Sequence, residues 1–181
     1  MGSPVGNINN VKIFVLYLME NLNYPMDFVT LNDIVMQTDY VMYLDFAEAF
    51  NEMLDGGLID KSEESGEEYY FVTERGRCVA EELKSDLRES LLDKALEAGL
   101  RYLSFKKRGI TVRCSVEKNP DGTYQVICSF TENKNTIFTQ SLIVDSLERA
   151  RAMQENFYER PETIYKGVLA LMSGNVNYLF S

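Results

Sequence analysis

The stretch YLDFAEAFNEMLDGGLIDKSEESGEEYYFVTERG, residues 43–76, decides the fold of the first half of the chain. Its first part carries apolar side chains at helical spacing and ends at Gly56-Gly57, where a left-handed residue forms most easily. Two short runs of strand-forming residues follow, on either side of Ser65-Gly66. Thr73 then suits the start of another helix. The stretch therefore predicts a helix, a two-stranded hairpin and a further helix.

The flanking segments predict more helices. Residues 7–22 carry an apolar stripe at helical spacing that is wide enough to meet two neighbours, either a second subunit or the rest of a monomeric core. We expect a short second helix with Thr30 as its N-cap and Asp33 as the capping-box partner. The helix that begins after Thr73 is expected to be long and to reach about Gly99.

The helix predicted over residues 43–55 has two unlike faces. At about 100° per residue, the apolar face that is expected to meet a core consists of Leu44, Ala47, Phe50 and Leu54. The opposite, exposed face is expected to consist of Asp45, Glu48, Asn51, Glu52 and Asp55. The hairpin places Lys61 among acidic residues near the Ser65-Gly66 turn. Residues 43–76 contain two basic residues against ten acidic ones, so the surface formed by this helix and hairpin is predicted to be anionic.

The second half of the chain alternates with the period of strands. Runs at residues 110–118, 123–132 and 136–144 predict an antiparallel meander. The turn Asn119-Pro120-Asp121-Gly122 fixes its register. That register pairs Val116 with Val126, Cys114 with Cys128, and Val112 with Phe130. Two helices should cover one face, the first with Asp145 and Glu148 as a capping box and the second with Pro161 at its first position.

Charge divides the chain in the same way. The 181 residues carry a formal charge of −10, of which residues 1–87 contribute −12 and residues 88–181 contribute +2. We therefore expect two domains, residues 7–99 and 100–181. The longest apolar run, Ile13 to Met19, is far shorter than the ~20 residues that cross a bilayer, so no membrane association is predicted. The odd number of cysteines and the absence of a signal peptide favour a cytoplasmic protein with reduced thiols. Met1-Gly2-Ser3 resembles a cloning remnant.

Catalytic chemistry has little support in the sequence. The chain contains no histidine, the residue best suited to proton transfer near neutral pH. It also lacks the phosphate-binding, nucleophile-elbow, zinc-protease and calcium-loop motifs. We predict that the protein is not an enzyme and has no catalytic residue, cofactor or metal.

Two quoted segments carry a family resemblance. GGLIDK and EEYYFVTERGR, in residues 56–61 and 67–77, resemble the corresponding part of PadR-like and MarR-like winged-helix regulators. With IFVLYLMENLNYPM and YLDFAEAFNEMLDGGLI, the chain further resembles a family of winged-helix proteins of Firmicutes whose C-terminal region is a domain of unknown function. The predicted order of elements is that of a winged helix-turn-helix, with three helices, a two-stranded wing and a long fourth helix. A three-stranded antiparallel sheet covered by two helices follows, so the expected fold class is α+β. The resemblance implies a transcriptional regulator.

Two functions follow from these features. The first is the transcriptional regulator that the resemblance implies. A homodimer paired through the first and fourth helices is expected whichever function holds. DNA binding is disfavoured by charge, because phosphate binding requires Lys and Arg, which the third helix lacks. The alternative is a module that binds a basic protein surface. One basic cluster could contact phosphate, an acidic partner or the acidic first half of the chain, or be solvated: Arg101, Lys106, Lys107, Arg108 and Arg113.

Overall fold

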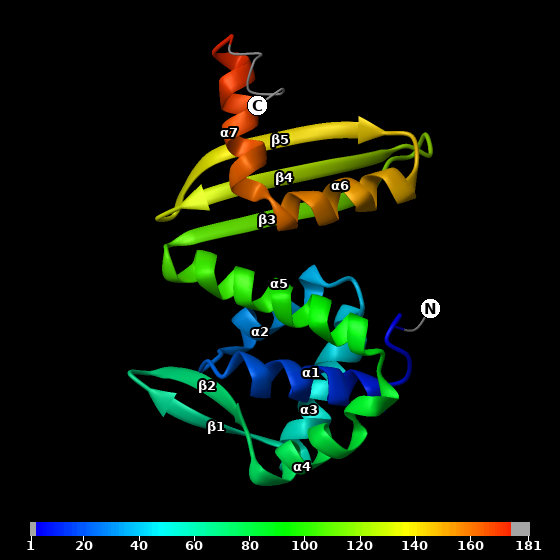
Figure 1. Ribbon diagram of the computed structural model, residues 1–181, viewed down its shortest axis with the longest axis vertical. Helices are drawn as coiled ribbons and strands as arrows, with labels where there is room; N and C mark the ends of the chain where they lie inside the picture. The colour runs from blue at the N-terminus through cyan, green and yellow to red at the C-terminus, as the bar shows by residue number, and fades with distance from the viewer. Residues whose placement is uncertain (1–2, 175–181) are drawn as a thin grey trace. The chain divides into compact units, whose positions relative to one another are not determined.

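The computed structural model describes residues 3–174, which form helices, a hairpin and a sheet (Figure 1). Within these residues the fold is α+β, as predicted, with seven α-helices, one two-stranded sheet and one three-stranded antiparallel sheet. The chain divides into two compact units, with the boundary between Tyr102 and Leu103. The first unit contains α1 (Ile8–Leu22), α2 (Phe28–Gln37), α3 (Tyr43–Asp55), β1 (Ile59–Glu64), β2 (Glu67–Val72), α4 (Glu74–Leu83) and a 3-10 turn (Lys84–Asp86). Helix α5 (Glu89–Lys107) begins in the first unit and ends in the second.

Helix α1 lies at the centre of the first unit. It contacts α3, α4 and β2, and most of its side chains are buried by them. Asn7 caps its first turn by accepting a hydrogen bond from the Asn10 amide. The wide apolar stripe of this helix is therefore covered within one chain, by the rest of the core: Val11, Ile13, Phe14, Val15, Leu16, Leu18, Met19 and Leu22.

Four aromatic rings determine which face of α3 is buried. The ring of Phe50 lies 4.9 Å from that of Phe28 on α2 and 4.8 Å from that of Tyr70 on β2, and Phe46 joins the same cluster. These contacts bury Phe46, Ala49, Phe50 and Met53. The prediction that Leu44 faces the core is wrong, because the aromatic side chains take the core positions and leave Leu44 75% exposed.

The start of α2 also differs from the prediction. The N-cap is Asp27, whose carboxylate accepts hydrogen bonds from the Thr30 amide at 2.8 Å and the Thr30 hydroxyl at 2.7 Å. Thr30 itself lies inside the helix and is buried. Asp33 is not a capping partner; it accepts a hydrogen bond from the Tyr102 hydroxyl at 2.9 Å. The predicted N-cap, Thr30, lies three residues after the actual one.

The long helix predicted after Thr73 is interrupted. Thr73 is its N-cap, as predicted, but α4 ends at Leu83, the 3-10 turn follows, and Leu87 is extended, with φ −106° and ψ 150°. The interruption buries Leu87, and the new helix α5 begins at Glu89. The leucine spacing that suggested one helix therefore belongs to two.

The second unit is built on β3 (Ile110–Lys118), β4 (Tyr124–Glu132) and β5 (Asn135–Val144). The strand order is β3-β4-β5, and the register of β3 and β4 is the one predicted. Cys114 lies opposite Cys128, and Val112 lies opposite Phe130. The turn residue Gly122 has φ +87°, a conformation that glycine adopts without strain. Turn chemistry and apolar alternation were sufficient to predict this hairpin.

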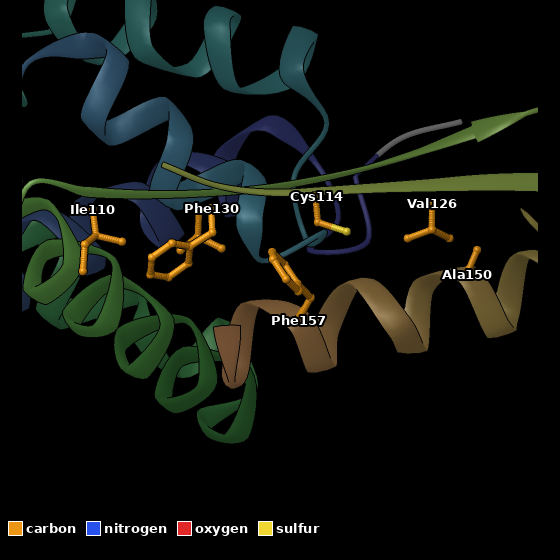
Figure 2. Packing of buried hydrophobic residues seen from close by; sticks show 7 residues of the cluster. Ile110, Cys114, Val126, Phe130, Ala150 and Phe157 are labelled. Atoms are coloured by element: carbon orange, nitrogen blue, oxygen red, sulfur yellow. The ribbon is translucent and has the colours of Figure 1, made fainter. Parts of the chain in front are cut away.

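Helix α6 (Leu147–Glu159) lies along one face of this sheet, and α7 (Pro161–Met172) follows it in a different direction (Figure 1). Figure 2 shows Ala150 and Phe157 of α6 directed toward Cys114, Val126 and Phe130 of the sheet. Pro161 occupies the first turn of α7, as predicted. The predicted cap Asp145 is wrong, because Ser146 accepts the hydrogen bond from the Arg149 amide at 3.3 Å.

Candidate interaction surface of the third helix and the hairpin

The exposed side of α3 combines carboxylates with apolar groups. Because the buried residues occupy one side of the helix, positions about 180° away point outward. The residues at these positions, all exposed, are Leu44, Glu48, Asn51 and Asp55. The exposed face is thus centred on Leu44 and Asn51 as well as on two carboxylates.

Asp45, the first of the predicted exposed acids, lies on one flank of α3. It is half-buried, and its carboxylate accepts hydrogen bonds from the amide and the hydroxyl of Ser3. The Ser3 hydroxyl in turn accepts a hydrogen bond from the Met42 amide at 2.8 Å, directly before α3. Ser3 belongs to the segment that resembles a cloning remnant, yet it is only 6% exposed. It ties the N-terminal segment to the start of α3.

Glu52 lies on the same flank. Its carboxylate forms an ion pair with Lys12 of α1, with 2.5 Å between Glu52 Oε2 and Lys12 Nζ. The four acids that the sequence assigned to one stripe therefore divide into two pairs. Asp45 and Glu52 are engaged by their own chain, whereas Glu48 and Asp55 lie on the outward side.

Apolar side chains are also exposed at the starts of α3 and α2. At the start of α3, Tyr43 is 55% exposed and Leu44 75%, and Met42 precedes them with 44% exposed. Val29 in the first turn of α2 is also exposed. Sequence reasoning missed this apolar component, because it assigned Leu44 to the core. The outward residues Leu44, Glu48, Asn51 and Asp55 are called the α3 surface below.

The hairpin adds further acidic side chains. Its turn residues Ser65 and Gly66 have φ values of +56° and +84°, as a two-residue turn of the I′ kind requires. Lys61 does not project alone, because its Nζ lies 2.5 Å from Glu68 Oε1. Hydrogen bonds from Lys61, and then from Tyr70, hold the pKa of Glu68 below its usual range. The remaining carboxylates of the hairpin, all exposed, are Asp60, Glu63, Glu64 and Glu67.

A shallow cavity lies beside the hairpin. It has a volume of about 230 Å³ and is lined mainly by the end of α1, the strand β2 and the segment that follows α1. Arg77 at its wall pairs with Glu20, with 3.1 Å between Arg77 Nε and Glu20 Oε2. The cavity is open and of mixed polarity, and its one arginine is already paired.

The predicted basic cluster is distributed over both units. Arg101 belongs to the first unit, and the other four residues belong to the second. Arg108 pairs with Glu162 of α7 at 2.7 Å and lies over the Phe105 ring. Arg113 is exposed on β3. In the described part of the chain, Arg108 is thus neutralised within its own unit, by Glu162.

Two absences hold for residues 3–174. None of their helices has the length and apolar character needed to cross a bilayer. No group of three or more His, Cys, Asp or Glu side chains in this range is arranged to hold a metal ion.

Comparison with known proteins places the chain in a family without assigning an activity. Residues 11–172 match the family described as a domain of unknown function (DUF4364), so the chain belongs to that family. The match extends over both units. No curated protein and no solved structure gives a significant match.

Proposed function

We propose that the first unit is a winged-helix domain that binds a partner protein through the α3 surface, and that the partner presents basic side chains around an apolar contact. The observation that carries this proposal is the composition of the outward face of α3, where Leu44 is 75% exposed beside Glu48 and Asp55. Exposed apolar groups rimmed by polar ones are typical of protein interaction sites.

Charge argues against duplex DNA as the ligand of this surface. Phosphate contacts are made by Lys and Arg, and the outward face of α3 has neither. Placing Glu48 or Asp55 near a phosphate costs on the order of 1 kcal/mol before screening. Several cations of the first unit are also already paired with carboxylates: Lys12, Lys61, Arg77 and Lys84.

A second candidate function is a dimeric transcriptional regulator. Its support is the order of elements, three helices followed by a hairpin and a further helix, which is the order in winged-helix regulators. The resemblance of residues 56–61 and 67–77 to PadR-like and MarR-like proteins points the same way. This candidate requires DNA contacts from cations outside α3.

Fluorescence anisotropy distinguishes the two candidates. One probe is a labelled amphipathic peptide with Lys and Leu at helical spacing; the other is a labelled mixed-sequence DNA duplex, tested at about 50 mM salt, where phosphate attraction is weakly screened. The proposal expects the peptide to bind and the duplex not to bind at micromolar protein. Duplex binding that weakens steeply with salt would instead establish the regulator.

Variants locate the contact. Glu48→Lys with Asp55→Lys, and separately Leu44→Ser, are expected to weaken peptide binding at least about tenfold, which corresponds to about 1.4 kcal/mol. The matched control is Glu82→Lys with Glu97→Lys, which makes the same charge change at exposed sites on α4 and α5. Equal loss in the control would mean that peptide binding reflects net charge, and the α3 surface would not be the site.

A further inference from the structure

Two thiols face each other across the sheet of the second unit. Cys114 of β3 and Cys128 of β4 are directly opposite in the register, and their Sγ atoms lie 2.8 Å apart in a hydrogen bond. Cys114 belongs to the buried cluster between the sheet and α6 (Figure 2), and Cys128 packs against the same cluster. Cys114 is 6% exposed, whereas Cys128 is partly accessible. The question is whether these strands would allow the sulfurs to bond covalently.

The backbone hydrogen bonds of Cys114 show which kind of cross-strand pair the two cysteines form. Its N–H donates to the Tyr158 hydroxyl at 3.0 Å, and its carbonyl accepts from Gln154 Nε2 at 2.7 Å. Both groups therefore point away from β4 and toward α6. The pair Cys114–Cys128 is consequently one of the non-hydrogen-bonded pairs of the antiparallel ladder, which alternate with hydrogen-bonded pairs.

The hydrogen bonds at the two ends of the β3–β4 hairpin lead to the same assignment of Cys114–Cys128. The Asn119 amide donates to the Thr123 carbonyl at 2.8 Å, and the Asn133 amide donates to the Gly109 carbonyl at 2.8 Å. Counting in steps of two from either hydrogen-bonded pair makes Cys114–Cys128 a non-hydrogen-bonded pair. The Cα atoms of such pairs lie about 4.5 Å apart, within the roughly 4.4–6.8 Å that disulfides span. A bond between the sulfurs thus requires no movement of the strands.

We propose that Cys114 and Cys128 form a reversible dithiol–disulfide site, oxidised by hydroperoxides and reduced by small or protein dithiols. This site goes beyond the proposed interaction of the first unit, and it lies wholly within the second. Its two thiols have different roles, because one is partly accessible and the other is buried against α6.

The surroundings of the two thiols indicate which one attacks the peroxide. Cys128 is partly accessible, whereas Cys114 is buried against α6, so a peroxide reaches the Cys128 sulfur first. The hydrogen bond that the two sulfurs share lowers the pKa of Cys128 and, together with burial, raises the pKa of Cys114. Because the thiolate is the nucleophile in thiol chemistry, the accessible Cys128 is the attacking residue and the buried Cys114 the resolving one.

The reaction proceeds in two balanced steps. The Cys128 thiolate attacks one oxygen of hydrogen peroxide, the O–O bond breaks, and the hydroxide that leaves takes up a proton to become water. Cys128 is then a sulfenic acid. The Cys114 sulfur attacks the Cys128 sulfur, the S–S bond forms and the S–O bond breaks, and the released hydroxide takes the Cys114 proton to form a second water. The two thiols lose two electrons, and the peroxide gains them.

The test uses the full chain with Cys78→Ser, because Cys78 is an exposed thiol that would react independently. The folded protein is treated with hydrogen peroxide and analysed by intact mass and peptide mapping. The expected result is a mass loss of two hydrogen atoms, the loss of both alkylatable thiols together, and a peptide linking Cys114 to Cys128. Dithiothreitol should restore both thiols.

Two comparisons make the test decisive. In the chain with Cys78 retained, peroxide should link Cys114 to Cys128 and leave Cys78 outside that link. In Cys78→Ser with Cys114→Ser, Cys128 should accumulate sulfenic or sulfinic acid and no intramolecular link. The proposal is overturned if both thiols survive peroxide that modifies Cys78, if Cys128 is overoxidised while Cys114 stays reduced, or if the link forms only after unfolding in urea.

Discussion

Lys12 of α1 and Glu52 of α3 form an ion pair, with 2.5 Å between Lys12 Nζ and Glu52 Oε2. The Lys12 side chain is 19% exposed and that of Glu52 45%, so the pair lies at the edge of the core. It joins the central helix to the helix that carries the candidate interaction surface. Lys12 neutralises the charge of Glu52, so Glu48 and Asp55 are the acidic residues of the outward face of α3.

A double-mutant cycle measures this pair. Urea unfolding of Lys12→Met, Glu52→Gln and the double variant should give a coupling free energy of about 0.5–1 kcal/mol. The value is this small because Glu52 is partly exposed, and the coupling should decrease further with added salt. The exposed pair between Glu81 of α4 and Lys84 of the 3-10 turn is the control, and its coupling free energy is expected to be smaller. Equal coupling in the two cycles would contradict the partly buried position of Lys12.

The N-cap of α2 gives a second prediction. Asp27→Ala removes the acceptor of the Thr30 amide and should lower the free energy of unfolding by about 1 kcal/mol. Asp27→Asn keeps an acceptor oxygen and should lose clearly less stability. Both are measured by urea unfolding monitored by circular dichroism. If Asp27→Asn is as destabilised as Asp27→Ala, the cap is not what stabilises this helix end.

Gly76 in the first turn of α4 has no room for a side chain. A Cβ there would lie 2.1 Å from the Leu58 carbonyl oxygen and 2.8 Å from Val72 Cγ1. Because one obstacle is backbone, Gly76→Ala should destabilise by about 3 kcal/mol or more. Gly57→Ala is the comparison: its Cβ would meet nothing within 4 Å, but its φ of +65° is strained for alanine. Its cost should be about 1 kcal/mol. Comparable melting temperatures for the two variants would show that the hairpin and α4 are less closely packed.

The hairpin ion pair predicts a pH effect. Because hydrogen bonds from Lys61 and then Tyr70 lower the pKa of Glu68, this carboxylate stabilises the hairpin above the usual glutamate pKa. That contribution is lost as pH falls through the lowered, folded-state value. In Lys61→Gln the titration midpoint of Glu68, followed by carboxyl carbon NMR, should rise. Tyr70→Phe should raise it less, since Lys61 is the larger cause. An unchanged midpoint in Lys61→Gln would show that the pair is not formed in solution.

Much of the fold could be predicted because several local signals agree. The hairpin of β3 and β4 has a strong turn and alternating apolar residues that select one register, so Cys114 and Cys128 could be paired from sequence alone. The bounds of α3 were also predictable, because Gly56-Gly57 ends its apolar pattern. The buried side of α3 could not be predicted from the sequence. The apolar pattern does not reveal that Phe28 and Tyr70 pack against Phe46 and Phe50.

The site was predictable only in part for similar reasons. Glu48, Asn51 and Asp55 lie on the outward side of α3, but the engagement of Asp45 depends on Ser3, which is distant in sequence. No local pattern reports such a contact. Spacing also failed at Leu83 and Leu87, because leucines four apart fit one helix as well as two helices that meet at a turn.

Helix α5 packs closely on the helices before it. A Cβ at Gly99 would lie 2.9 Å from Leu22 Cδ1 and 3.3 Å from Ile34 Cγ2, so the backbone of α5 runs against the ends of α1 and α2. The Tyr102 hydroxyl adds its hydrogen bond to Asp33. Two copies that exchanged this helix would first have to detach it from its own chain. Assembly by that route would be an activated process with a strong temperature dependence, far slower than a diffusional encounter of preformed surfaces.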